Sequence, residues 1–302
     1  MLQHNLYTFI SGLLISALSF AFVGCTETIN LDTNDTDPVI VIYGLITDVP
    51  AYQEVQVSSS TGYFDDAPNA KISGAKVSIS TDDGEIYNLK EVASTPGIYK
   101  TTELMSGAPG KTYHLTVKTD FNNDGADETY EAETKMPEKV ELDSINITSQ
   151  KVTGYKFFSI NMYAQEPAGE NYYMCRYQIN DSLYTQISKY IIFDDLSLDN
   201  QYIKGLSLSY FADLEDKSRY SDDDIKDMAF IASGDSVKVL FSNISKAYYN
   251  FLTQCQEEID GENPFFGGPL SNIDTNISNG GIGYFGAYCV SEAAGVAPEK
   301  EE

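Results

Sequence analysis

The amino-acid sequence predicts a mainly β protein. An N-terminal sandwich of the immunoglobulin-like or transthyretin-like kind precedes a β-rich second domain with one docked helix. Seven short runs rich in Val, Ile, Thr and Tyr follow one another within residues 38–136, which is the spacing of such sandwiches. The 22 Tyr and 15 Phe residues also favour strands. Helical spacing occurs near residues 245–260, and the length of 302 residues suits two domains.

The seven runs of the first domain are bounded by turn signals. They read PVIVIYGLIT, EVQVSSSTGYF, AKVSIST, IYNLKEV, GIYKTTE, TYHLTVKT and TYEAETKM. Asp82-Asp83-Gly84 and Ala108-Pro109-Gly110 are two of the turns that separate them. Side chains alternate between the faces of a strand, so Tyr113 and Leu115 should share one face and His114 should lie on the polar face.

A domain boundary is expected at Met136-Pro137, because proline cannot continue a central strand. The second domain then covers residues 137–292. Its strand-like runs are ELDSINITS, KFFSINMYAQ, YYMCRYQIN, LYTQISKYIIF and DSVKVLFSN. Alternating apolar and polar residues in these runs predict further strands.

The rest of the second domain has mixed signals. Residues 212–228 are acidic, and the Ser-Asp-Asp-Asp stretch from Ser221 suits a loop or the start of a short helix. A Gly/Asn/Pro-rich stretch leads into a final strand around residues 282–290. Residues 293–302 are expected to form a disordered acidic tail.

The helix near residues 245–260 has both a start and a stop signal. Ser245 is a good N-cap, and Gly261 follows the last helical residue. Apolar residues at i, i+3, i+4, i+7 and i+11 form one face, which should be buried. They are Tyr248, Phe251, Leu252, Cys255 and Ile259.

The first 24 residues contain no Lys, Arg, Asp or Glu, and their apolar stretch over residues 9–23 is typical of a signal peptide. The stretch ends in Phe22-Val23-Gly24-Cys25, which resembles a bacterial lipobox. We therefore expect a lipid on Cys25, anchoring the protein to a membrane, with residues 25–37 as a polar tether. A transmembrane anchor or a secreted protein with a free Cys25 are the alternatives.

The other three cysteines are Cys175, Cys255 and Cys289. Outside the cytosol, one disulfide plus one buried thiol is one interpretation, and three buried thiols is another. If a disulfide forms, Cys255–Cys289 is the favoured pair.

The net charge and the small number of histidines exclude several classes of function. The formal net charge of −26 argues against a nucleic-acid partner, because phosphate binding needs clustered Lys and Arg. His4 leaves with the signal peptide, so a nucleophile–histidine arrangement would have to use His114. A multi-histidine zinc site cannot be built, and the sequence lacks the common catalytic and phosphate-binding motifs. A carboxylate-pair glycosidase stays open, but we expect a protein that is not an enzyme.

One motif suggests a metal. The stretch from Asp120 to Glu131 fits the twelve-residue calcium-loop pattern, with Gly125 at the sharp turn. The expected oxygen ligands are Asp120, Asn122, Asp124, Ala126 through its carbonyl, Glu128 and Glu131. The flanking segments are strands rather than helices, and a polar hairpin loop would have the same composition. Calcium and a plain hairpin therefore both remain open, and no other cofactor is expected.

Two surface features suggest a function, and each also has a simpler interpretation. Three Asp-Ser-apolar tripeptides resemble the acceptor of O-glycosylation in Bacteroidetes, which would modify Ser144, Ser182 and Ser236. Closely spaced tyrosines could form a ligand-binding face, although half-buried strand residues are the commoner outcome. They are Tyr172, Tyr173, Tyr177, Tyr184 and Tyr190. The absence of Trp lowers the expectation of a sugar-stacking module.

Several motifs coincide along the mature chain. They are the lipobox, the IVIYGLIT and GAKVSI strands, PGIY, PGKTYHLTV, NPF, NISNGG and GYFG. Together they resemble the Bacteroidetes outer-membrane lipoprotein family known as domain of unknown function 4249. The resemblance implies location at the outer membrane, on its periplasmic or its outer face. It also implies a TonB-dependent receptor as a neighbour, and it brings no catalytic residues.

We therefore expect a non-catalytic lipoprotein that is an accessory or binding component of an outer-membrane transport system. The alternative is an adhesin-like or glycan-binding surface module.

Overall fold

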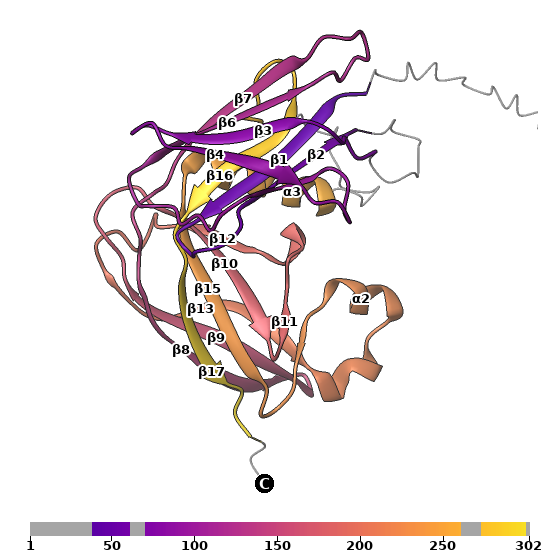
Figure 1. Cartoon of the computed structure of the whole chain (residues 1–302). Coiled ribbons are helices and arrows are strands. Elements are labelled where there is room, and N and C mark those ends of the chain that lie inside the picture. The colour runs from indigo at the N-terminus through magenta and orange to yellow at the C-terminus, as the bar shows by residue number, and fades with distance from the viewer. Residues whose placement is uncertain (1–37, 61–69, 261–272, 300–302) are drawn as a thin grey trace, which may run out of the picture. The chain divides into compact units, whose positions relative to one another are not determined.

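The computed structural model describes residues 38–60, 70–260 and 273–299, which belong to one compact unit (Figure 1). These residues form three β-sheets and a few helices. The mainly β class with a docked helix is confirmed. The signal peptide, the polar tether and Cys25 lie outside the described residues.

The first sheet has eight strands in the order β16-β1-β2-β5-β4-β3-β6-β7. All seven expected N-terminal strands are present, and the eighth comes from the C-terminal part of the chain. Their bounds are β1 Ile40–Thr47, β2 Glu54–Ser59, β3 Lys76–Thr81, β4 Ile86–Glu91, β5 Ile98–Thr101, β6 Thr112–Thr119, β7 Glu128–Lys135 and β16 Ile282–Tyr288. β16 pairs with β1 in parallel, with Tyr43 opposite Tyr284.

This sheet curls around a single core. Every strand contributes inward-facing apolar side chains to one cluster, including Ile42 from β1, Leu115 from β6 and Phe285 from β16. Alternation assigns the faces as expected: Tyr113 is about 1% exposed, whereas the His114 side chain is 42% exposed. The two layers of the expected sandwich are thus joined by hydrogen bonds into one nearly closed, barrel-like sheet.

Asn276 closes the seam of this sheet between β7 and β16. Its Nδ2 donates to the Glu133 carbonyl at 3.1 Å and to the Phe285 carbonyl at 2.8 Å, and its Oδ1 accepts from the Phe285 N–H at 2.9 Å. Ser278 adds an N–H bond to the Glu131 carbonyl at 2.8 Å. The NISNGG motif therefore satisfies backbone groups at both edges, which would otherwise stay unpaired.

The remaining strands form two further sheets. One has the order β11-β10-β15-β17, with β12 also paired to β10, and the other has the order β14-β13-β9-β8. The bounds are β8 Leu142–Val152, β9 Tyr155–Gln165, β10 Tyr172–Ile179, β11 Ser182–Leu183, β12 Ile191–Asp194, β13 Tyr202–Asp213, β14 Phe230–Ile231, β15 Ser236–Ile244 and β17 Ser291–Val296. Phe158 of β9, Tyr173 of β10 and Phe241 of β15 meet in a second core between these sheets.

Helix α3, Lys246–Asp260, begins as expected, because Ser245 Oγ accepts from the Tyr248 N–H at 3.2 Å. Tyr248, Phe251 and Leu252 are buried in a third cluster, which also includes the outer faces of β1 and β16 and one face of β10. The expectation for Ile259 was wrong: it is 48% exposed. It lies in the last turn of the helix, beyond the strands that cover the preceding turns.

Two short helices precede β14. They are η2, Leu214–Arg219, and α2, Asp222–Asp227. Ser221 caps α2, and the Asp224 side chain returns the bond to the cap, so the acidic stretch starts a short helix as expected. No helix in the described part of the chain combines the length and apolar character needed to cross a membrane.

Three segments differ from expectation. The run LYTQISKYIIF is not one strand: β11 ends at Leu183, the 3-10 helix η1 covers Ile187–Lys189, and β12 begins at Ile191. Residues 293–296 are not a disordered tail but part of β17, which pairs with the edge of β15, and Ala297 is buried. The strand β13 was not predicted, because bulges at Lys204/Leu206 and Ser207/Ser209 break its alternation. The division into domains at Pro137 stays a prediction: the sheets change there, but β16 returns to the first sheet.

Candidate ligand-binding cleft

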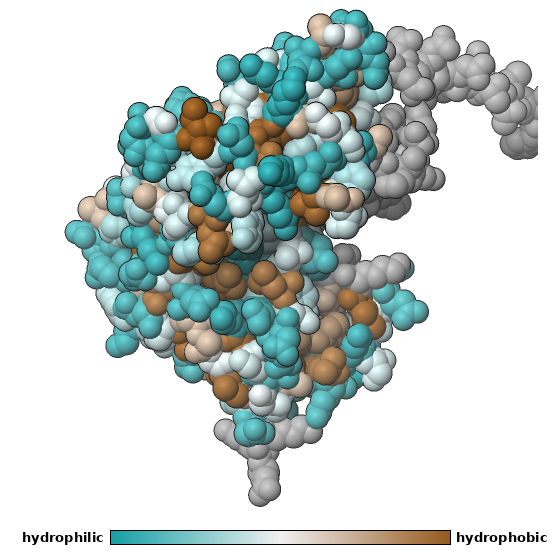
Figure 2. All heavy atoms as spheres, in the orientation of Figure 1, coloured by the Kyte–Doolittle hydropathy of each residue, from teal (hydrophilic) through white to brown (hydrophobic). Residues whose placement is uncertain are grey.

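A cleft of about 600 Å³ lies between the first sheet and the β10 side of the second. Its walls come from the outer face of β1, from β2 and β10, from α3 and β16, and from the segment that includes η1, Ile187–Lys189. Figure 2 shows a hollow between the first sheet and the other strands, with hydrophobic side chains inside it. The volume is within the range of about 300–1,000 Å³ that small-molecule sites occupy.

Strand β10 places an arginine in this cleft. Its buried residues alternate: Tyr173 and Cys175 enter the second core, whereas Tyr172 and Met174 face the third cluster. Arg176 has the parity of Tyr172 and Met174, so its side chain points toward the first sheet and lines the cleft.

Arg176 is half-buried and lacks an acidic partner. Its Nε is buried without a hydrogen-bond partner, and within the described chain it forms no ion pair. Its guanidinium lies 5.8 Å from the centre of the Tyr288 ring. The pKa of Arg176 is raised: burial acts to lower it, whereas Tyr288, Tyr190 and Tyr248 act to raise it, Tyr190 also through a side-chain hydrogen bond. A guanidinium stays charged in proteins, so this site has a positive charge without a carboxylate.

The sequence contains only one other arginine, Arg219, and its surroundings are the opposite. Arg219 Nη1 donates to the Asp216 carboxylate and to the Gly154 carbonyl, both at 2.8 Å. Its guanidinium also stacks 3.7 Å from the centre of the Tyr155 ring. Arg219 is therefore a neutralised surface residue, and Arg176 is not.

The tyrosines around Arg176 are neutral. Burial raises the pKa of Tyr43, Tyr248 and Tyr288 above the ordinary value, so their hydroxyl groups remain protonated near neutral pH. The Tyr43 and Tyr248 hydroxyl groups share a hydrogen bond of 2.9 Å, which joins β1 to α3 at the base of the cleft. These rings provide polarisable walls and hydroxyl groups, but no negative charge.

Helix α3 also positions the wall of the cleft that the η1 segment forms. Gln256 Nε2 donates to the Ile187 carbonyl at 2.9 Å and to the Tyr190 carbonyl at 2.8 Å. The Tyr190 hydroxyl donates in turn to the Thr185 carbonyl at 3.1 Å. These bonds fix the η1 segment against the helix and so define the width of the cleft.

Glu54 is the one carboxylate among the residues that line the cleft, and it is already paired. Lys100 Nζ lies 3.2 Å from one of its oxygens, and Gln56 Nε2 donates to the other at 3.0 Å. Tyr52 also lines the cleft, with 55% of its surface exposed. The outer part of the cleft is thus polar and adaptable, whereas its base is aromatic.

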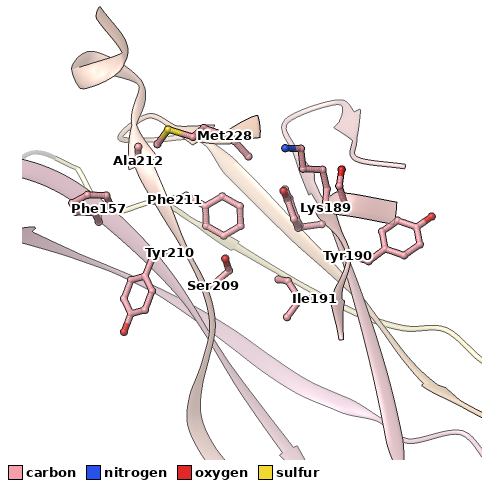
Figure 3. Close-up of a pocket in the computed structure, with 12 residues that line it drawn as sticks. Phe157, Lys189, Tyr190, Ile191, Ser209, Tyr210, Phe211, Ala212 and Met228 are labelled. Carbon is pink, nitrogen blue, oxygen red and sulfur yellow. The ribbon is translucent and has the colours of Figure 1, made fainter. Parts of the chain in front are cut away.

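A second cavity, of about 250 Å³, shares Tyr190 with the cleft. Figure 3 shows Phe211 and Met228 on one side of it, across from Lys189 and Tyr190. Its volume is less than half that of the cleft and lies below the usual range for small-molecule sites. The larger cleft is therefore the better candidate.

The structure brings together part of the expected calcium set. Carboxylate oxygens of Asp120, Asp124 and Glu128 lie within 4.8 Å of one another. Asn122 donates to Glu128 at 2.7 Å. Glu131 does not join them: β7 begins at Glu128, and an odd spacing along a strand places Glu131 on the opposite face.

The same loop has the bonds of a plain hairpin. Asp120 accepts from the N–H groups of Asp124 at 3.0 Å and Gly125 at 3.1 Å, and Asp124 accepts from the Ala126 N–H at 2.9 Å. Glu128 accepts from the Phe121 N–H at 2.7 Å. These bonds order the loop with its own backbone, so calcium stays a prediction.

Ser144, Ser182 and Ser236 are all exposed, on β8, β11 and β15. The Asp181-Ser182 and Asp235-Ser236 pairs lie near each other. Asn180, which precedes the first pair, forms hydrogen bonds to the Asp235 carboxylate and to the Ser236 backbone. The tyrosine-rich segment is mostly core: Tyr173 is 0% and Tyr177 is 4% exposed. Modification of these serines stays a prediction.

All three described cysteines are free thiols, so the Cys255–Cys289 pair is not formed. Cys289 packs into the core of the first sheet, whereas Cys255 packs against the third cluster, so the two belong to different parts of the interior. Burial raises the pKa of both thiols to about 11 and that of Cys175 further. These cysteines are therefore unreactive packing residues near neutral pH.

Sequence reasoning missed the cleft and Arg176. One signal was present: Arg176 is the one charged residue in the largely apolar and aromatic stretch YYMCRYQI, where a charge needs a reason. The sequence could not show that the walls come from strands as distant as β1 and β16, or that no carboxylate approaches the arginine.

The family model described as Domain of unknown function (DUF4249) matches residues 26–294. No curated protein sequence matches the chain. Among solved structures, a crystal structure of the Salmonella alpha-2-macroglobulin mutant Y1175G is similar over 70% of this chain, with 14% identity and a TM-score of 0.21. The chain spans 14% of the length of that protein, and at this TM-score the similarity carries no argument about fold or function.

Proposed function

The chain belongs to the family described as domain of unknown function DUF4249, and on that premise we propose a non-catalytic binding protein of the bacterial outer membrane. In this proposal a lipid on Cys25 anchors the protein, and the body is an accessory or binding component of a TonB-dependent transport system. The single observation that carries the binding role is the cleft, because it is large enough for a small molecule and aromatic at its base.

The location rests on the sequence. The lipobox-like stretch that ends at Cys25 follows an uncharged apolar segment, and a polar tether comes next. Two or more acyl chains on one cysteine hold a protein stably at a membrane, since each buried CH₂ contributes about 0.8 kcal/mol. The partner suggested by the family resemblance is a TonB-dependent receptor.

Two experiments test this proposal. Cys25→Ala should move the protein from the membrane to the soluble fraction and remove the label of a radioactive lipid precursor. Purification of the tagged full chain in mild detergent should then recover an outer-membrane receptor in stoichiometric amounts, as identified by mass spectrometry.

The outcomes separate the alternatives. Membrane retention of Cys25→Ala without lipid label would favour a helical anchor. Recovery of the protein alone, together with binding to a polysaccharide array, would favour the adhesin-like or glycan-binding module. Protease treatment of whole cells reports which face of the outer membrane the body occupies.

A further inference from the structure

The charge at Arg176 needs an explanation. A charged group that is partly removed from water is costly when no opposite charge compensates for the lost hydration. Buried polar atoms are almost always hydrogen-bonded, yet Arg176 Nε is not. The described chain offers neutral tyrosines around it and no ion pair. An anion that enters the cleft would supply the missing opposite charge and an acceptor for Nε.

The surroundings indicate how much charge the anion has. Among the described residues that line the cleft, Arg176 is the only cationic side chain, and Glu54 is already paired with Lys100. The protein as a whole has a formal charge of −26, which repels multiply charged anions. A single guanidinium therefore suits one negative charge. Its planar fork of donors matches a carboxylate, whereas a di- or triphosphate would need several cations.

The walls indicate the rest of the ligand. Leu45 from β1, Ile187 from the η1 segment and Phe251 from α3 line the cleft beside the aromatic rings. Such walls favour an apolar or aromatic body, and a volume of about 600 Å³ accommodates a small organic molecule. Tyr52 also lines the cleft and offers an exposed aromatic ring to a bound molecule.

We infer that the cleft binds a small organic monocarboxylate, with the carboxylate at Arg176 and the apolar body against Leu45, Ile187 and Phe251. The inference deepens the binding role proposed above by naming the class of ligand, and it rests on that role. It assigns to Arg176 the selection of acids over neutral molecules of the same shape.

The absence of tryptophan from the sequence allows a direct test. Indole-3-acetate is an aromatic monocarboxylate, and its fluorescence can be excited where tyrosine does not absorb. The full chain in mild detergent should raise the fluorescence anisotropy of indole-3-acetate beyond the value in empty micelles. Indole-3-acetamide, of the same shape but neutral, should bind at least about tenfold more weakly, as expected for loss of a charge-assisted hydrogen bond.

Variants locate the effect. Arg176→Met keeps an unbranched apolar stem of similar length but removes the charge, and should weaken indole-3-acetate at least about tenfold while leaving indole-3-acetamide unchanged. Arg219→Met is the matched control, because it removes the other arginine and its ring contact outside the cleft. It should bind the probe as the wild type does. Tyr52→Ala should weaken both probes by a few-fold without loss of stability.

The comparison of indole-3-acetate with indole-3-acetamide uses wild-type protein, so it tests the proposed ligand class even if Arg176→Met fails to fold. Equal affinity for acid and amide, no binding of either probe by wild type, or unchanged binding by a folded Arg176→Met would overturn the inference. Receptor recovery by wild type without acid selectivity would refute the ligand class and leave the transport role. Acid-selective binding without a receptor partner would support the ligand class and refute the transport role.

Discussion

Side chains are buried in different ways in the first sheet and in strand β10 of the second sheet. In the first sheet, alternation along each strand decides which side chain is buried, and the inward residues of all eight strands share one core. Strand β10 is buried on both faces, against the second core on one side and against α3 and β1 on the other. Arg176 lies on the second of these faces, where the cleft leaves it half-buried and without an ion pair among the described residues. The comparison shows that the candidate site arises where separate cores meet.

The largest effect should come from disturbing the parallel pairing of β16 with β1 at Gly283. This residue has a φ of +108°, and an added Cβ would overlap the backbone of Ile42 on β1. Backbone strain and overpacking together predict that Gly283→Ala lowers the free energy of unfolding by about 4 kcal/mol, measured by urea denaturation.

Gly280→Ala is the matched control, because its φ is +74° but nothing lies near the added Cβ. It should cost about 1 kcal/mol through backbone strain alone. Equal losses in the two variants would show that the clash with β1 does not matter and that β16 and β1 are not closely packed at this position.

The next effect tests the cluster that joins the two regions. Leu252 on α3 is 0% exposed, so Leu252→Ala should lose about 3 kcal/mol of unfolding free energy in thermal or urea melts. Ile259→Ala, on the exposed last turn of the same helix, should change stability by less than about 1 kcal/mol. A larger loss from Ile259→Ala would contradict the observed exposure of Ile259. It would mean that Ile259 is buried with the rest of the apolar face, as helical spacing predicts.

A smaller effect is expected from the hydrogen bonds of the seam. Asn276→Ala leaves the Phe285 N–H and carbonyl without their amide partner, which should cost about 2 kcal/mol. Hydrogen exchange at the Phe285 amide should accelerate more than exchange within β10. If both regions exchange faster to the same degree, the seam does not open locally, and the two regions unfold as one.

The smallest effect concerns calcium at the β6–β7 loop. If Asp120, Asp124 and Glu128 hold calcium with a Kd of about 10⁻⁴–10⁻³ M, calcium at ten times Kd should stabilise the protein by about 1.4 kcal/mol. Calorimetry and melting curves measure this, with Asp124→Ala as the control. An unchanged melting temperature would leave the loop a plain hairpin.

The sequence by itself determined the elements whose signals are local. Seven strands, the Ser245 cap and the outward position of His114 follow from alternation, turn residues and capping, which involve neighbours a few positions apart. The NISNGG and GYFG motifs indicated the family, but not that Asn276 closes a sheet.

Only the tertiary structure decided the features that depend on distant partners. The parallel pairing of β16 with β1, the addition of β17 to β15 and the exposure of Ile259 depend on which elements pack together. Glu131 leaves the carboxylate group because a strand, not a helix, follows the loop. Arg176 is the clearest case: parity assigns its face, but its lack of a counter-ion depends on β1, α3 and β16, which alternation within β10 cannot reveal. Local patterns specify faces, whereas the solvation of a charge depends on everything that surrounds it.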